Sequence, residues 1–197
     1  MAQIFDEKGN VAPVTLIEAG PCYVVKIKKA GDEDNYNAIQ IGFSETKKIT
    51  KPVQGHLKKS GVDKKLRILR EFRDLKNQGF AELKAGDEIN VSSFKAGDSV
   101  AVSGISKGKG WAGVIKRWHF NRKPTSHGAK HETRAQGSVG SRFPQRVVKG
   151  RKMSGRLGAD RVTVKNLKVA AVDKKNNILA VKGAVPGRRG TLLEIRG

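Results

Sequence analysis

The sequence predicts a mostly β protein in which an antiparallel sheet curls into a barrel, with one long basic insertion. Apolar and polar side chains alternate along short runs, as in residues 23–28, and polar turn clusters such as 31–35 separate the runs. Alternation with a period of two indicates strands that bury one face, and its repetition at short spacing is typical of barrels. Residues 116–156 lie between two strand-rich parts and show neither strand nor helix periodicity.

The expected strands share a common pattern, a short run of apolar or β-branched residues beside a turn that contains Gly, Asp or Asn. They are residues 4–5, 11–19, 23–28, 39–43, 88–91, 100–102, 162–164, 167–169, 178–181 and 192–195. The clearest turns are residues 6–10, 31–35 and 174–177. Cys22 lies next to these strands and is interpreted as a small core residue, since no neighbour would activate its thiol.

Residues 44–80 depart from this pattern and predict an irregular lobe with a short helix. Residues 53–61 favour a helix that ends at Gly61, a residue type common just after helix ends. Residues 66–75 are ambiguous, because their apolar side chains recur every three residues but also share the parity of a strand. His56 is interpreted as a surface or packing residue.

The charge of the chain restricts the classes of partner. The 197 residues include 40 Lys or Arg and only 18 Asp or Glu, for a net charge of +22. Such an excess favours nucleic acid over an anionic membrane or an acidic protein. No apolar run approaches the 18 residues of a membrane span, and the N-terminus lacks a signal-peptide pattern. The single cysteine excludes an internal disulfide and fits a reducing cytoplasm.

Half of this excess lies in residues 116–156, which hold 12 Lys or Arg and a single acid, Glu132. Five Gly and two Pro interrupt any local order there. A stretch of this composition repels itself, stays open in water and needs a polyanion to fold against. Trp111, Trp118, Phe120 and Phe143 are interspersed among the cations, a combination that suits stacking on unpaired RNA bases.

Other chemistry finds little support in the same region. Gly108 and Gly110 resemble half of a phosphate-binding loop, but no Gly-Lys-Ser/Thr follows, so residues 106–111 are interpreted as a flexible basic hinge. His119, His127 and His131 lack cysteine partners and credible helical spacing, so no metal site is predicted. Acid–base catalysis has almost no carboxylates available here.

Several long motifs span nearly the whole chain, at residues 3–5, 13–18, 106–113, 116–118, 136–140, 149–153 and 181–187. In sequence and in order they resemble the large-subunit ribosomal protein L-three family in its bacterial form. The resemblance implies a six-stranded, translation-protein-type β-barrel with a long extension that penetrates ribosomal RNA (rRNA) toward the peptidyl transferase centre. It also favours a strand over a helix at residues 67–74.

The resemblance further implies a structural protein that binds 23S-type rRNA, nucleates early assembly of the large subunit and is ribosome-bound in the cytoplasm. Its implied neighbours are the ribosomal proteins numbered fourteen and nineteen. No catalysis, cofactor, metal, membrane or small-molecule substrate is expected. Two departures from the family pattern are expected to matter. The usual Gly- and Lys-containing segment before Met1 is absent, which leaves the first strand short. Gln145 follows Pro144 instead of preceding it, so glutamine methylation is not carried over.

The expected domains are a barrel at residues 1–110 and 157–197, with the lobe at 44–80, and a basic extended loop at 111–156. The expected rRNA-binding residues are Lys107, Lys109, Trp111, Lys116, Arg117, Trp118, His119, Arg122, Lys123, His127, Lys130, Arg134, Arg142, Arg146, Lys149, Arg151, Lys152 and Arg156. The expected tip of the extension comprises Gly140, Ser141, Arg142, Phe143, Pro144 and Gln145.

Two rival functions make different use of the basic arm. A nucleoid or assembly factor would use the same basic arm on free RNA or DNA. A small flavin-binding barrel oxidoreductase would have no use for the arm, and the sequence offers it no credible cofactor site.

Overall fold

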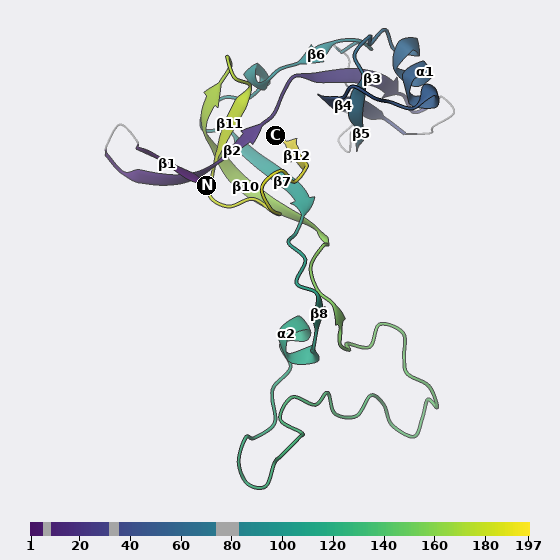
Figure 1. The fold of residues 1–197 in the computed structure, drawn as a ribbon, viewed down its shortest axis with the longest axis vertical. Coiled ribbons are helices and arrows are strands. Elements are labelled where there is room, and N and C mark those ends of the chain that lie inside the picture. The colour runs from purple at the N-terminus through teal and green to yellow at the C-terminus, as the bar shows by residue number, and fades with distance from the viewer. Residues whose placement is uncertain (6–8, 32–35, 74–82) are drawn as a thin grey trace. The chain divides into compact units, whose positions relative to one another are not determined.

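The computed structural model describes residues 1–5, 9–31, 36–73 and 83–197 (Figure 1). The chain divides into two compact units. The first comprises Met1–Val100, Asn166–Ala184 and Gly197, and the second comprises Ala101–Lys165 and Val185–Arg196. Most regular elements are strands, which confirms the prediction of a mostly β protein. The predicted domain boundaries at 110 and 157 stay a prediction.

The first unit holds β1, β2, β11 and β10 from Asn166 onward, paired antiparallel in the order β1–β2–β11–β10. Their bounds are β1 Ala2–Phe5, β2 Val11–Glu18, β10 Arg161–Asp173 and β11 Ile178–Lys182. In β2, Ala12 and Val14 are buried while Val11 and Pro13 are exposed, so the predicted alternation is confirmed. The predicted strands 162–164 and 167–169 belong to one strand, β10. The turn predicted at residues 174–177 is confirmed: an Asp173 carboxylate oxygen accepts hydrogen bonds from the Lys175 and Asn176 amides.

A second sheet of the first unit has the strand order β5–β4–β3–β6. Its bounds are β3 Cys22–Lys28, β4 Ala38–Glu45, β5 Leu66–Arg73 and β6 Glu88–Ile89; a 3-10 helix, Val91–Ser93, follows β6. The ambiguity at residues 66–75 is resolved as a strand as far as Arg73, because β4 offers a whole edge for pairing. Positions 74 and 75 lie outside the described residues.

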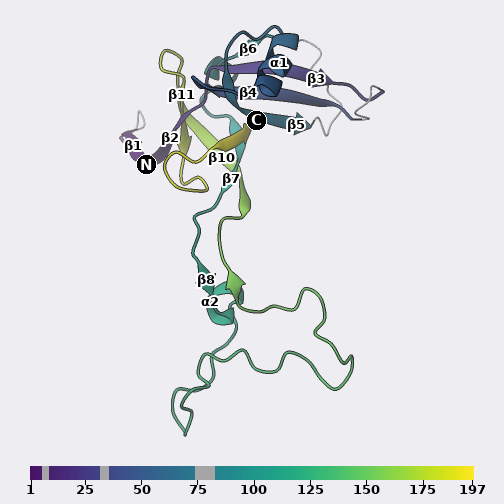
Figure 2. The same cartoon turned by 45° about the vertical axis from the view of Figure 1, so that its right-hand side comes forward.

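Helix α1, Lys51–Lys59, lies beside this four-stranded sheet in both Figure 1 and Figure 2. Pro52 stands in its first turn, where the missing amide hydrogen costs no helical bond. Leu57, 2% exposed, packs in a core cluster with Tyr23, Val25, Val62 and Leu66. The short helix predicted in residues 53–61 is therefore confirmed, and residues 44–73 hold this helix and the strand that the family resemblance favoured.

In the second unit, β7 (Ser99–Ile105) pairs with β12 (Leu193–Arg196), with Val102 opposite Ile195. Strand β7 also neighbours β10, and Ser103 Oγ lies 2.7 Å from Thr163 Oγ1. The remaining elements are β8 Trp111–Ala112, helix α2 Val114–Trp118 and β9 Gly155–Arg156. Across the described residues the strand orders are open and form no closed barrel. No helix in the described part is long and apolar enough to cross a membrane.

Replacement of a core leucine tests this packing. Leu66→Ala should lower the free energy of unfolding by about 2–5 kcal/mol, because it leaves a cavity under α1. Leu16→Ala is the matched control, since Leu16 is also in a strand but 54% exposed, against 1% for Leu66. Urea unfolding of both variants measures the difference, and equal losses would contradict the described core.

Candidate nucleic-acid interface

Two backbone segments of the second unit run side by side between β7 and β10 and form what we call the neck, residues 106–112 and 155–160 (Figure 1). Its ladder bonds run from Ser106 N to Asp160 O (2.9 Å), Lys109 N to Leu157 O (2.8 Å) and Leu157 N to Gly110 O (2.9 Å). Strands β8 and β9 continue this pairing, with Trp111 opposite Arg156. Residues 106–111, expected to be a flexible hinge, are instead one side of a hydrogen-bonded ladder.

Glycine makes the close approach of the two segments possible. Gly158 has a φ of +79°, and a Cβ placed on it would lie 2.2 Å from the Lys107 carbonyl oxygen. A side chain at Gly155 would lie 2.5 Å from Arg117 Nη1. Gly158 therefore excludes other residues through a backbone contact with a segment distant in the sequence, whereas a side chain at Gly155 would displace the Arg117 guanidinium. Sequence reasoning missed these two glycines because nothing local distinguishes them from glycines in turns.

A cluster around Trp118 joins the two ends of the basic stretch of residues 116–156. The Met153 carbonyl oxygen accepts hydrogen bonds from Arg117 Nη1 (3.0 Å) and from Trp118 Nε1 (2.8 Å). The Arg117 guanidinium lies 4.9 Å and Lys152 Nζ 5.6 Å from the centre of the Trp118 ring, both within the range of cation–π attraction. Four residues from both ends of the segment thus meet at one point.

Helix α2 positions two of these side chains and corrects the expectation that residues 116–156 contain no helix. Val114 is buried at its start, and His119 ends it with a left-handed φ of +60°. A helix of five residues is too short to show a periodic stripe, which explains why the pattern missed it. Met153 could not be predicted as part of this cluster either, because its backbone carbonyl oxygen rather than its side chain makes the contacts.

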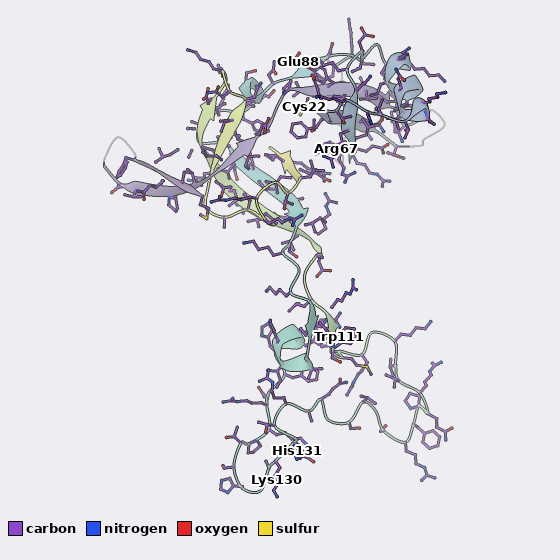
Figure 3. The ribbon with its side chains drawn as sticks, in the orientation of Figure 1. Cys22, Arg67, Glu88, Trp111, Lys130 and His131 are labelled. Atoms are coloured by element: carbon purple, nitrogen blue, oxygen red, sulfur yellow. The ribbon has the colours of Figure 1, made fainter. Side chains whose placement is uncertain are left out.

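Beyond α2, residues 119–154 form what we call the basic loop, and the structure assigns them no helix or strand. Its lysine and arginine side chains are all exposed. Figure 3 shows Trp111 at the neck and Lys130 and His131 on the loop beyond α2. Three contacts join residues of the loop that are nine or more positions apart in the sequence. Lys123 Nζ lies 2.6 Å from the Glu132 carboxylate, the Lys123 amide donates to the Thr133 carbonyl at 3.1 Å, and Arg151 Nη2 donates to the Ser138 carbonyl at 3.1 Å.

The expected tip, residues 140–145, is held by bonds between near neighbours. Ser138 Oγ donates to the Gly140 carbonyl at 2.6 Å, and Ser141 Oγ donates to the Phe143 carbonyl at 2.7 Å. The Arg142 guanidinium lies 5.9 Å from the centre of the Phe143 ring. Phe143 is 69% exposed, so one aromatic face with a neighbouring cation is open to solvent.

The electrostatics of the basic loop are strongly one-signed. Its single acid, Glu132, is already engaged by Lys123, whose hydrogen bond lowers the pKa of the Glu132 carboxyl. The other cations of the loop therefore have no acidic side chain of the loop to neutralise them. An arrangement of exposed cations and exposed aromatic rings can bind phosphates and stack on bases.

Comparison with known proteins identifies the family. Residues 26–177 match the family model described as Ribosomal protein L3. The chain belongs to this family. It is 52% identical to large ribosomal subunit protein uL3 of Thermosipho africanus over 197 residues, covering 100% of this chain and 93% of the relative. It is 51% identical to uL3 of Carboxydothermus hydrogenoformans (100% and 92% covered) and 48% identical to uL3 of Heliobacterium modesticaldum (98% and 90%).

For this member of the L3 family, the predicted rRNA-binding residues fall into three places. Lys107, Lys109, Trp111 and Arg156 lie on the neck; Arg117, Trp118 and Lys152 meet in the Trp118 cluster; the others lie on the basic loop or at its two ends. Seventeen of these 18 residues are exposed and Arg117 is half-buried. Their role in binding stays a prediction.

In the described part of this L3-family chain, no arrangement of side chains is suited to binding a metal ion or to activating a thiol. No group of three or more His, Cys, Asp or Glu side chains there could hold a metal ion. Cys22 Sγ lies 3.8 Å from the Ala19 carbonyl oxygen, and burial raises the pKa of the Cys22 thiol. A raised pKa keeps the thiol protonated, which agrees with a packing role for Cys22.

A pair of glycine substitutions tests the neck. Gly158→Ala should break the ladder, because the new methyl group meets the Lys107 carbonyl oxygen. Gly150→Ala is the matched control, because Gly150 also has a positive φ but a Cβ placed on it would meet no atom within 4 Å. Both variants carry a left-handed alanine, which costs about 1–2 kcal/mol. Only Gly158→Ala should accelerate hydrogen exchange at the amides of Lys109 and Leu157. Equal exchange in both variants would contradict the close approach.

Proposed function

We propose that this L3-family protein is a structural component of the large ribosomal subunit and binds large-subunit rRNA through the neck and the basic loop. The observation that carries the proposal is the exposure of all cations of a loop whose only acid is already paired. Such a loop has too little apolar surface to form a core of its own and too few acids to neutralise its cations. The phosphates of rRNA supply the missing negative charge. The names of the relatives support the same reading.

The division of labour within the second unit follows from its contacts. The paired neck and the Trp118 cluster hold the two ends of the basic loop together. Between them the loop carries cations that attract phosphates and a Phe143 ring that can stack on a base. Folding of the loop and binding of RNA are then a single event, in which the loop adopts the path that the RNA offers.

The wider setting belongs to the same proposal. The protein acts in the cytoplasm as part of the ribosome, supports early assembly of the subunit, and contacts neighbouring ribosomal proteins, those numbered fourteen and nineteen among them. The closure of six strands into a barrel and the penetration of rRNA by residues 111–156 are also proposals, supported by family membership. The chain has no catalytic role of its own in this proposal.

Salt-dependent binding to large-subunit rRNA tests the function. The slope of log affinity against log salt should be steeper than about four, and Lys149→Ala, Arg151→Ala and Lys152→Ala together should lower it by about two. A control triple, Lys168→Ala, Lys174→Ala and Lys175→Ala, removes the same charge from exposed positions of the first unit. Filter binding measures both slopes, with a random RNA of equal length as competitor. An unchanged slope would show that Lys149, Arg151 and Lys152 do not face phosphate, whereas equal affinity for the competitor would favour a nucleoid or general assembly factor.

The tip provides a functional test inside the ribosome. Phe143→Ala should change the rate of peptidyl transfer, or sensitivity to antibiotics of that centre, while subunits still assemble, because small shifts of supporting groups alter catalytic positioning. Val139→Ala is the control, since Val139 lies on the same loop and is 38% exposed. Sucrose gradients report assembly and puromycin reaction reports transfer. Reduced assembly with normal transfer would mean that Phe143 only anchors the loop.

A further inference from the structure

Helix α1 of the first unit has two chemically distinct faces. Leu57 packs in the core cluster, and Val53 is partly buried against it. The opposite side, which we call the outer face of α1, consists of Lys51, Pro52, Gly55, Lys58 and Lys59, all exposed. These positions are related by steps of three and four residues around Gly55, so they are neighbours on one surface of the helix. The outer face is thus three lysines arranged about a glycine.

Gly55 is unexplained by anything inside the described chain. Glycine is the least favourable helix-interior residue after proline, because it loses the most backbone freedom. Its φ is not in the positive region, so the backbone does not require glycine. A Cβ on Gly55 would meet no atom within 4 Å, so packing does not require glycine either. A bare backbone at an exposed helix position therefore points to close approach by something outside the chain.

The charge around Gly55 indicates what approaches. Helix α1 contains no acid, and within the described residues no ion pair involves Lys51, Lys58 or Lys59. Lys47 and Lys48, just before the helix, are also exposed. Glu45, the nearest preceding acid in the sequence, is engaged by Lys64 Nζ at 2.8 Å. The outer face therefore offers cations without local counter-charges.

We infer that the outer face of α1 is a second RNA-contact site, separate from the basic loop, which binds a sugar-phosphate backbone laid across Gly55. The lysines bind phosphates at both ends of a surface about 12 Å long, given the helical rise of 1.5 Å per residue. A protein partner fits less well, because lysine is depleted in protein interfaces and the outer face carries no large apolar side chain. This inference rests on the proposed rRNA binding and adds a second place where it occurs.

Two sets of variants of the full-length chain test the site with transcribed large-subunit rRNA as the probe. Lys51→Ala, Lys58→Ala and Lys59→Ala together should lower the salt slope by about two and abolish a discrete set of backbone protections in hydroxyl-radical footprinting. The control triple at Lys168, Lys174 and Lys175 should leave those protections in place. Loss of the same protections in both triples would show a diffuse charge effect and overturn the site.

Substitution of Gly55 gives the sharper test, because it should raise the stability of the free protein and weaken rRNA binding. Gly55→Ala should raise the urea midpoint of the free protein, since alanine favours the helix. It should nevertheless weaken rRNA binding by about tenfold, because the methyl group holds the backbone away. Gln54→Ala, one residue away in the same helix and half-buried, should leave binding unchanged. Wild-type binding by Gly55→Ala would overturn the close approach.

The outcomes also separate this inference from the function on which it rests. If the wild-type chain fails to bind rRNA at all, the proposed function fails. If it binds and the Lys51/Lys58/Lys59 triple binds equally well, only the second site fails. If that triple binds naked rRNA normally but reduces incorporation into complete subunits, the outer face contacts a neighbouring protein, and the inference is overturned in favour of that partner.

Discussion

The backbone pairing of the neck is the constraint on which the second unit depends. Without the bonds between residues 106–110 and 157–160, the two ends of a strongly cationic loop would be free to move apart. The ladder holds the two ends of the loop at hydrogen-bonding distance. Next to the ladder, the Met153 carbonyl oxygen accepts bonds from Arg117 and Trp118 and so links the two ends again. Hydrogen bonds of the backbone, rather than a hydrophobic core, thus oppose electrostatic repulsion at this point of the chain.

The alternation of side chains was sufficient to predict most strands, because burial of one face leaves a direct mark on the sequence. The same signal explains why Ala12 and Val14 are buried in β2 while their neighbours are exposed. Strand pairing was less accessible. Residues 66–73 became a strand because β4 supplies an edge, and an edge contributed by a distant segment leaves no local trace.

The candidate interface was predictable in kind and less so in detail. An excess of lysine and arginine over a single acid identified residues 116–156 as a polyanion-binding segment, and the exposure of all but Arg117 among these basic side chains is consistent with that role. The contacts that organise the segment involve groups with no sequence signature. The carbonyl of Met153, the bare Cα of Gly155 and the left-handed backbone of Gly158 act through position alone.

The order of strands along the chain has a consequence for a protein still being synthesised. Strand β12 pairs with β7, and the whole basic loop lies between them in the sequence. A nascent chain therefore displays its full run of cations to the cell before the partner strand of β7 has been translated. During that interval the cations of the loop are open to any polyanion nearby, so the binding segment is exposed before the fold around it is complete.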